Sequence, residues 1–207
     1  MGFLSMKRKA NLIFLTGFST AGKSTIGPIL ANSLGFDFID VDRAIVELEQ
    51  KSVVEIFSEK GEAYFRQREL ELISQLSHAE NLVVALGGGT LEHDQTYEII
   101  KNSGTLIYLK SDLDTLTRRL SNKDDRPMMK SASGEPLTPQ ELRARIEQMF
   151  LRREERYKSH AIISVETDQT PIGKTVEHLT RQIEKHLKEH TAPQDTASDN
   201  PQTLRIV

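Results

Sequence analysis

The sequence predicts an α/β fold of three layers, in which helices cover both faces of a five-stranded parallel sheet. Short runs of apolar residues alternate along the chain with longer amphipathic stretches of helical period, which is the pattern of α/β proteins. The short runs are almost continuously apolar, with few polar positions between the apolar ones. Such runs are typical of strands that are buried on both faces of a parallel sheet.

The predicted strands are five apolar runs, at residues 12–15, 36–39, 82–86, 105–109 and 161–165. Helical periodicity predicts seven helices, near residues 23–34, 42–60, 62–77, 93–102, 112–121, 139–157 and 172–189. Ligands of parallel sheets bind beyond the carboxyl ends of the strands. The residues that directly follow each strand are therefore the first candidates for a functional site.

Three segments lie outside this regular alternation and set the predicted domain boundaries. Residues 1–10 form an N-terminal lead, and residues 11–189 form a single domain. Residues 122–138 are polar and contain Gly and Pro, which predicts a mobile lid over an active site. Residues 190–207 are poor in core residues and rich in Thr, Asp, Gln, Ser and Pro, which predicts a disordered tail.

The composition narrows the classes of function. The 27 Lys and Arg residues nearly balance the 30 Asp and Glu residues, whereas nucleic acid or an anionic membrane would require a basic surplus. The chain contains no Cys, which excludes disulfides and thiolate zinc sites. No apolar run reaches the roughly 18 residues that span a bilayer, and the run at 12–15 is too short for a signal peptide. We expect a soluble, cytoplasmic protein, and a monomer, that binds neither nucleic acid nor membranes.

The strongest motif is GFSTAGKS at residues 17–24, which fits the pattern G-x-x-x-x-G-K-[ST] between the first strand and a helix. Its glycines let the backbone turn N–H groups toward phosphate oxygens, and the helix N-terminus adds partial positive charge. We expect Lys23 to reach the β- and γ-phosphates of ATP, and the Ser24 hydroxyl to ligate Mg²⁺. The other expected ATP ligands are Thr20, Ala21, Gly22 and Thr25.

Asp40 and Asp42 follow the second predicted strand at its ligand-facing end. Carboxylates two residues apart on an extended chain point the same way, so both could face the phosphates. One would then hold a Mg²⁺-bound water while the other accepts the proton of a substrate hydroxyl. Alternatively, Asp42 only caps the following helix, as an Asp at a helix start commonly does.

The glycine triplet at 87–89 closes the third predicted strand, where it either donates backbone N–H groups to a small ligand or forms a flexible turn. Arginines on predicted helices also allow two interpretations, because they could bind a carboxylate or lie on a solvated face: Arg66, Arg152, Arg153 and Arg156. Arg126 differs, because a cation on a lid above phosphates suits stabilisation of a transferring phosphoryl group.

Taken together, these motifs resemble the shikimate kinases, a branch of the nucleoside-monophosphate-kinase-like P-loop proteins, over about residues 11–187. The resemblance implies the P-loop form of the three-layer fold, with its mobile lid. It also implies an ATP- and Mg²⁺-dependent kinase that phosphorylates the 3-hydroxyl of shikimate, a step toward chorismate and the aromatic amino acids. ATP and shikimate would be its small-molecule partners.

The resemblance also implies roles for individual residues. In the D-x-D of the family, similar to residues 40–42, the first Asp orients Mg²⁺ through water and the second binds the shikimate hydroxyls. Phe65-Arg66 with Glu69 resembles the F-R-x-x-E motif, whose Arg binds the shikimate carboxylate. The glycine triplet resembles one that contacts the substrate, here through Gly88 and Gly89.

Motifs in the second half of the chain imply further residues that bind the nucleotide and the substrate. Arg126, before Pro127, resembles the lid arginine that reaches ATP phosphate, and the implied catalytic residues are Lys23, Asp42 and Arg126. Arg119 resembles the arginine that packs on the base, and residues 165–169 resemble the adenine-facing loop, which ends at Gln169. Arg153, four residues before Tyr157, resembles the second arginine that binds the carboxylate.

The sequence departs from the family's pattern in three places. The phosphate loop has Phe-Ser-Thr-Ala where members usually carry small residues including another Gly, and the lid is a few residues longer. After Arg153 the chain reads Glu-Glu-Arg-Tyr in place of Pro-Leu-Tyr, so Arg152 competes with Arg153 as the carboxylate ligand. Two other functions stay open: a P-loop kinase of another small hydroxy acid such as gluconate, and a catalytically silent nucleotide-binding regulator.

Overall fold

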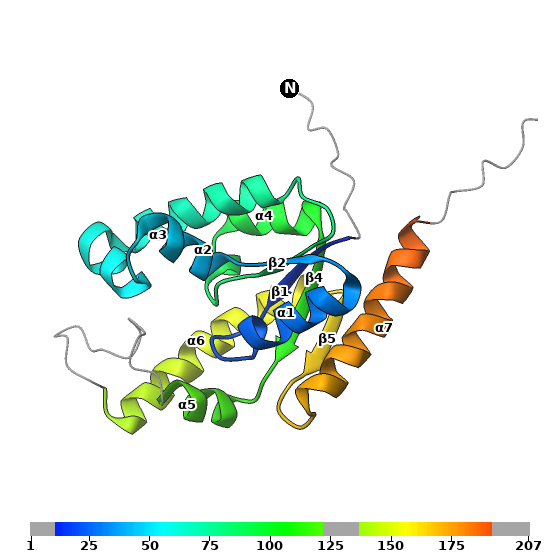
Figure 1. Ribbon diagram of the computed structural model, residues 1–207. Coiled ribbons are helices and arrows are strands. Elements are labelled where there is room, and N and C mark those ends of the chain that lie inside the picture. Colours follow the sequence, from blue (N-terminus) through cyan, green and yellow to red (C-terminus); the bar gives the residue numbers. More distant parts are fainter. Residues whose placement is uncertain (1–10, 122–136, 192–207) are drawn as a thin grey trace, which may run out of the picture.

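The computed structural model describes residues 11–121 and 137–191 of the chain. Five strands form one parallel sheet in the order β2-β3-β1-β4-β5 (Figure 1). The predicted α/β class and the five-stranded parallel sheet are therefore confirmed. The strands are β1 (Leu12–Thr16), β2 (Asp37–Asp40), β3 (Leu82–Ala85), β4 (Thr105–Lys110) and β5 (Ile163–Glu166).

Helices form the two outer layers. Helices α1 and α7 pack against each other beside one face of the sheet, while α4 and α6 pack on β4 (Figure 1). The crossover from β1 to β2 runs one way along the sheet, and the crossovers from β2 to β3, β3 to β4 and β4 to β5 run the other way. Right-handed crossovers in the two directions place their helices on opposite faces. The helices are α1 (Lys23–Leu34), α2 (Val41–Glu49), α3 (Val53–Leu76), the 3₁₀ turn η1 (Thr90–Glu92), α4 (Asp94–Ser103), α5 (Leu113–Ser121), α6 (Pro139–His160) and α7 (Ile172–Thr191).

The predicted helix at 42–60 is two helices. Helix α2 ends at Glu49, and Gln50 adopts a left-handed conformation with φ 52°. Ser52 then caps α3 in a capping box with Glu55, a start signal that the periodicity alone did not reveal. Helix α3 continues to Leu76 through a kink at Gly61, where φ is 82°.

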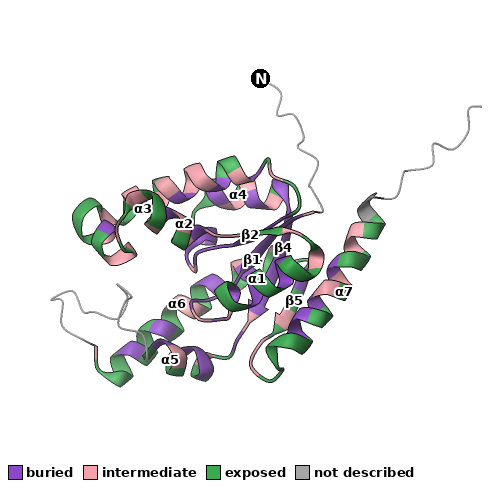
Figure 2. Ribbon diagram, in the orientation of Figure 1, coloured by how far each residue is buried: buried purple, intermediate pink, exposed green. Residues whose placement is uncertain are grey.

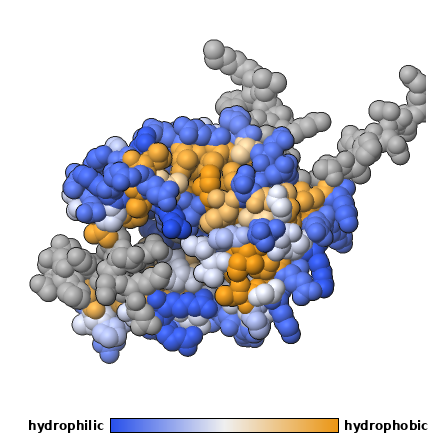
Figure 3. All heavy atoms as spheres, viewed as in Figure 1, coloured by the Kyte–Doolittle hydropathy of each residue, from blue (hydrophilic) through white to orange (hydrophobic). Residues whose placement is uncertain are grey.

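Burial follows the position of each strand in the sheet. Every residue of β1 and β3 is buried, and β4 is buried except at its last residue (Figure 2). The edge strands differ, because β2 has no fully buried residue and β5 has one. The expectation that all five strands are buried on both faces is wrong at the two edges, where a strand has only one neighbour. In Figure 3 the outer faces of α3 and α7 are hydrophilic.

The three irregular segments lie largely outside the described residues: 1–10, 122–136 and 192–207. The last residue of the predicted lid, Thr138, belongs to a helix start, because it caps α6 in a capping box with Glu141. The first two residues of the predicted tail continue α7 to Thr191. None of the described helices combines the length and apolar character of a membrane span.

The tight packing of β1 against the start of β4 leads to a stability test. A Cβ on Gly104 would lie 2.5 Å from the carbonyl oxygen of Leu12, a backbone atom of the central strand. We expect Gly104→Ala to lower the free energy of unfolding by about 1–3 kcal/mol through overpacking. Gly173 of α7 is the matched control, since a Cβ there meets nothing within 4 Å and Ala favours helix by about 0.5–1 kcal/mol. Urea unfolding of both variants should give changes of opposite sign, and equal changes would contradict this packing.

Candidate active site

The phosphate loop connects β1 to α1 as the motif predicted. Gly17 and Gly22 have φ of 145° and 105°, conformations that suit glycine, and Thr20 has φ 68° although it is β-branched. The side chain of Lys23 folds back over the loop, where Nζ donates hydrogen bonds to the carbonyl oxygens of Gly17 at 2.7 Å and Phe18 at 3.0 Å. The ammonium group is therefore held at the concave side of the loop.

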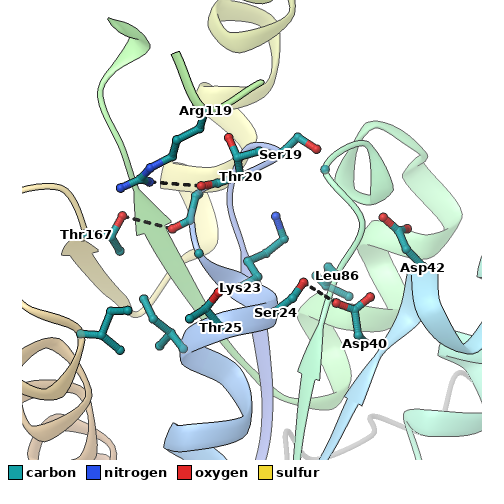
Figure 4. Close-up of a pocket in the computed structure, with 15 residues that line it drawn as sticks. Ser19, Thr20, Lys23, Ser24, Thr25, Asp40, Asp42, Leu86, Arg119 and Thr167 are labelled. Carbon is teal, nitrogen blue, oxygen red and sulfur yellow. Dashed lines mark hydrogen bonds between the residues drawn. The ribbon is translucent and has the colours of Figure 1, made fainter. Parts of the chain in front are cut away.

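A cavity of about 480 Å³ opens in front of this loop (Figure 4). Its lining includes nearly every expected nucleotide ligand: Thr20, Ala21, Gly22, Lys23, Ser24, Thr25, Asp40 and Arg119. Gln169 is exposed and does not line this cavity, whereas Thr167 and Ile172, from the same region after β5, do. Arg126, the expected lid arginine, lies outside the described residues.

The two aspartates have different local structures. Asp40 ends β2 and caps α2, since its carboxylate accepts a hydrogen bond from the Arg43 N–H at 3.2 Å. Its other oxygen accepts a hydrogen bond from Ser24 Oγ at 2.6 Å. Asp42 lies in the first turn of α2, so it neither caps that helix nor continues an extended chain. It nevertheless reaches the same cavity as Asp40.

Arg119 connects α5 to the phosphate loop. Its guanidinium donates to the carbonyl oxygen of Thr20 at 3.1 Å (Figure 4). It also pairs with Asp168 at 3.3 Å. Asp168 in turn accepts hydrogen bonds from Ser111 Oγ and from the N–H of Asp112, both at 2.6 Å. The hydrogen bond to its carbonyl oxygen helps to hold Thr20 in this conformation, which a glycine would adopt without strain.

A second cavity, of about 390 Å³, adjoins the first, because Ser19, Asp42 and Gly88 line both. The second cavity also brings together four residues from distant parts of the sequence, Arg66, Gly89, Glu92 and Arg153. The expected substrate ligands therefore share one cavity beside the phosphate loop.

Arg66 is held on the wall of the second cavity by two carboxylates of its own helix. Its guanidinium pairs with Glu69 at 3.0 Å and with Glu62 at 2.9 Å, and Glu69 is fully buried. Burial by itself lowers the pKa of Arg66, but the charges and hydrogen bonds of these carboxylates outweigh it and raise the pKa. These carboxylates therefore favour the charged form of Arg66 despite its burial.

Arg153 and Arg152 share one counterion but differ in exposure. Arg153 Nε and an Arg152 terminal nitrogen each lie 2.6 Å from a different oxygen of Glu92. The Arg153 side chain is 7% exposed and lies against the Phe18 ring, whereas the Arg152 side chain is 68% exposed. The interpretation as a solvated face is therefore wrong for Arg153 and Arg66, whereas Arg152 is exposed and also lines the second cavity.

The glycine triplet lies where these charged groups meet. A Cβ on Gly89 would lie 2.7 Å from Arg66 Nη2 and 3.4 Å from Arg153 Nη2. A Cβ on Gly87 would lie 2.6 Å from Asp42 Oδ1 and 2.9 Å from Glu69 Oε1. The triplet is therefore more than a flexible turn, because it leaves the space that the two guanidiniums and Asp42 occupy.

Comparisons with known proteins identify the family. The family model described as "Shikimate kinase" matches residues 19–184. A shikimate kinase from Chloroherpeton thalassium is 59% identical over 181 residues, which cover 87% of this chain and 96% of that protein. The chain belongs to the shikimate kinase family. The prediction of an ATP-dependent phosphotransferase of this family is thereby confirmed.

Solved structures of shikimate kinases share this fold. The enzyme from Acinetobacter baumannii in complex with shikimate has a TM-score of 0.74 at 26% identity, covering 88% of this chain and 95% of that one. The enzyme from Bacteroides thetaiotaomicron has a TM-score of 0.74 at 32% identity, covering 84% of this chain and 98% of that one.

One contributor to this shikimate kinase site, Glu92, was missed from the sequence, and two others, Gly87 and Thr167, were predicted only as members of a motif. Glu92 is the counterion of Arg153, and Gly87 makes room for Asp42. Thr167 Oγ1 lies 3.1 Å from the carbonyl oxygens of both Ala21 and Lys110, so it connects the end of β4 to the phosphate loop. Thr167 lies within the predicted adenine-facing loop at 165–169, but the sequence did not indicate its contact with the phosphate loop.

The Thr167 contact leads to a test of the nucleotide cavity. Thr167→Val removes the hydroxyl and keeps the shape, so the Ala21 carbonyl loses a partner and the loop loosens. We expect the KM for ATP in shikimate phosphorylation to rise about fivefold, which is the effect of losing about 1 kcal/mol. Thr180→Val is the matched control, because Thr180 Oγ1 is buried without a hydrogen-bond partner among the described residues. A rise of equal size in both variants would contradict the assignment.

Proposed function

We propose that this shikimate kinase binds ATP in the first cavity and shikimate in the second, and transfers the γ-phosphoryl group to the 3-hydroxyl of shikimate. One observation carries the proposal. Asp42 lines both cavities, and Arg66 and Arg153 both line the second cavity close to Gly89. An acid held by these arginines would have its hydroxyls near the phosphate loop.

The second cavity suits a small hydroxy acid by charge as well as by position. Two guanidiniums can each donate charge-assisted hydrogen bonds to one carboxylate. Both are oriented by carboxylates behind them, Arg66 by Glu62 and Glu69 and Arg153 by Glu92. Gly88 and Gly89 present backbone without a side chain beside them, so the ring of the acid can approach closely.

Asp42 is proposed to aim the reacting hydroxyl and to accept its proton as the phosphoryl group leaves ATP. Phosphoryl transfer passes through a loose transition state, so positioning and charge neutralisation contribute most of the rate. Lys23, held at the concave side of the loop, would neutralise charge on the γ-phosphoryl group. Arg126 is proposed for the same task on the grounds of its sequence motif, since it lies outside the described residues.

Ser24 and Asp40 fit a magnesium ion by their chemistry. Their side chains offer hard oxygen atoms 2.6 Å apart beside the phosphate loop, and Mg²⁺ in kinases is bound through one or two such groups, water and substrate phosphates. Within the described residues no cluster of three or more His, Asp or Glu side chains could hold a metal, which suits an ion that arrives with its nucleotide. When bound, Mg²⁺ would neutralise phosphate charge; Ser24 would hold it directly, and Asp40 through water.

We also propose the organisation in which the site works. The kinase domain runs from residue 11 to the end of α7 at Thr191, and the proposed lead, lid and tail are residues 1–10, 122–137 and 192–207. A monomer is consistent with two cavities that are lined by residues of one chain. A cytoplasmic location is consistent with the absence of Cys, which fits a reducing compartment.

A phosphate-transfer assay over a panel of hydroxy acids tests the proposed reaction. We expect ATP-dependent turnover of shikimate and none of gluconate. The control variant Asp42→Asn should lower kcat at least about a hundredfold while ATP binding persists, because a positioned general base contributes about 10²–10⁴-fold. Turnover of gluconate without turnover of shikimate, or binding of ATP without any transfer, would contradict the proposal.

The shared counterion of Arg152 and Arg153 gives a separate prediction. Arg153→Ala should raise the KM for shikimate about thirtyfold or more with a smaller change in kcat, because a charged contact present before and during the reaction is lost. Arg152→Ala is the matched control, and its exposed side chain should make the change less than about threefold. The reverse order of the two KM values would assign the carboxylate to Arg152.

A further inference from the structure

Helix α6 contacts the glycine triplet through two side chains that are one turn apart. Arg153 extends its terminal nitrogens toward Gly88 and Gly89, and Tyr157 donates a hydrogen bond from its hydroxyl to the Gly88 carbonyl oxygen at 2.5 Å. Tyr157 is 1% exposed, so no solvent competes for this bond. Its ring packs on that of Tyr108, with centroids 5.3 Å apart.

The Tyr157 hydroxyl acts as a hydrogen-bond donor. Burial raises its pKa well above the ordinary value, and the nearby charge of Arg153 lowers it by less. Burial therefore favours the protonated phenol, the form that donates to the Gly88 carbonyl.

The carbonyl of Gly88 belongs to the same peptide group as the N–H of Gly89. The structure has no cis peptide bonds among the described residues, so these two groups point in opposite directions. A glycine backbone has no side chain to fix its rotation. A bond that fixes the Gly88 carbonyl therefore also fixes the direction of the Gly89 N–H, and Gly89 is one of the residues that line the second cavity.

We infer that Tyr157 is a positioning residue for the substrate, and that its hydroxyl fixes the Gly88–Gly89 peptide between Arg66 and Arg153. The inference rests on the proposed function, since it assigns the second cavity to shikimate. Tyr157 acts through the backbone and through the ring packing that places α6, and it does not touch the reacting atoms. Tyr157 thereby links the position of α6, the helix that carries Arg153, to the position of the glycine triplet.

The chain offers a matched control in Tyr108. The Tyr108 ring packs on the Tyr157 ring and is equally buried. The Tyr108 hydroxyl, however, has no hydrogen-bond partner among the described residues. Tyr157→Phe and Tyr108→Phe each remove one buried hydroxyl and keep the stacked rings. Only the first removes a bond to the triplet.

Steady-state kinetics of the two variants and the wild-type enzyme test the inference. We expect Tyr157→Phe to raise the KM for shikimate about tenfold, the factor that corresponds to about 1.4 kcal/mol, because the peptide contact is lost equally in the ground and transition states. Its kcat and its KM for ATP should stay within about twofold of the wild-type values, and Tyr108→Phe should leave all three constants within that range.

Each other outcome has a defined meaning. An unchanged KM for shikimate in Tyr157→Phe, an equal rise in the KM for ATP, or an equal rise in Tyr108→Phe would overturn the inference. Loss of folding in Tyr157→Phe alone, seen in thermal unfolding, would assign the hydroxyl to stability and also overturn it. Failure of the wild-type enzyme to phosphorylate shikimate would instead contradict the proposed function.

Discussion

The guanidinium groups of Arg66 and Arg153 come together at Gly89, and the site depends on holding these two like charges close to each other. Each charge is balanced on its far side, by Glu69 and Glu62 for Arg66 and by Glu92 for Arg153. Removing one of these carboxylates would be destabilising, because a buried charge that loses its partner lowers the stability of a protein by several kcal/mol. Because these carboxylates balance the two positive charges, both guanidiniums can lie close to Gly89. An anionic substrate would be held most strongly there.

The parallel sheet makes this arrangement possible. The phosphate loop follows β1, Asp40 ends β2 and the glycine triplet follows β3, so neighbouring strands deliver all three to the same edge. Helix α6 supplies Arg153 and Tyr157, whose side chains reach the triplet. Glycine at 87 and 89 is what lets these groups approach, because a side chain at either position would collide with them.

Local signals in the sequence predicted the parts of the site that depend on local structure. The phosphate loop was predictable because its glycines, Lys23 and Ser24 occupy consecutive positions with one shared task, and the D-x-D and glycine motifs lie at strand ends. Contacts between distant residues were not predictable in the same way. Glu92 and Arg153 are 61 residues apart, and no periodicity marks Glu92 as a counterion. The break between α2 and α3 was missed because the apolar period continues through it, although Ser52 and Glu55 signalled a helix start.

The central claim is that paired guanidiniums bind the carboxylate of the substrate. Titration calorimetry with shikimate and with its uncharged methyl ester tests this most directly, because the two ligands differ only at that group. Charge-assisted hydrogen bonds contribute about 1.5–3 kcal/mol each, so the account predicts that the ester binds at least about a hundredfold more weakly. Equal affinities for the acid and the ester would contradict it.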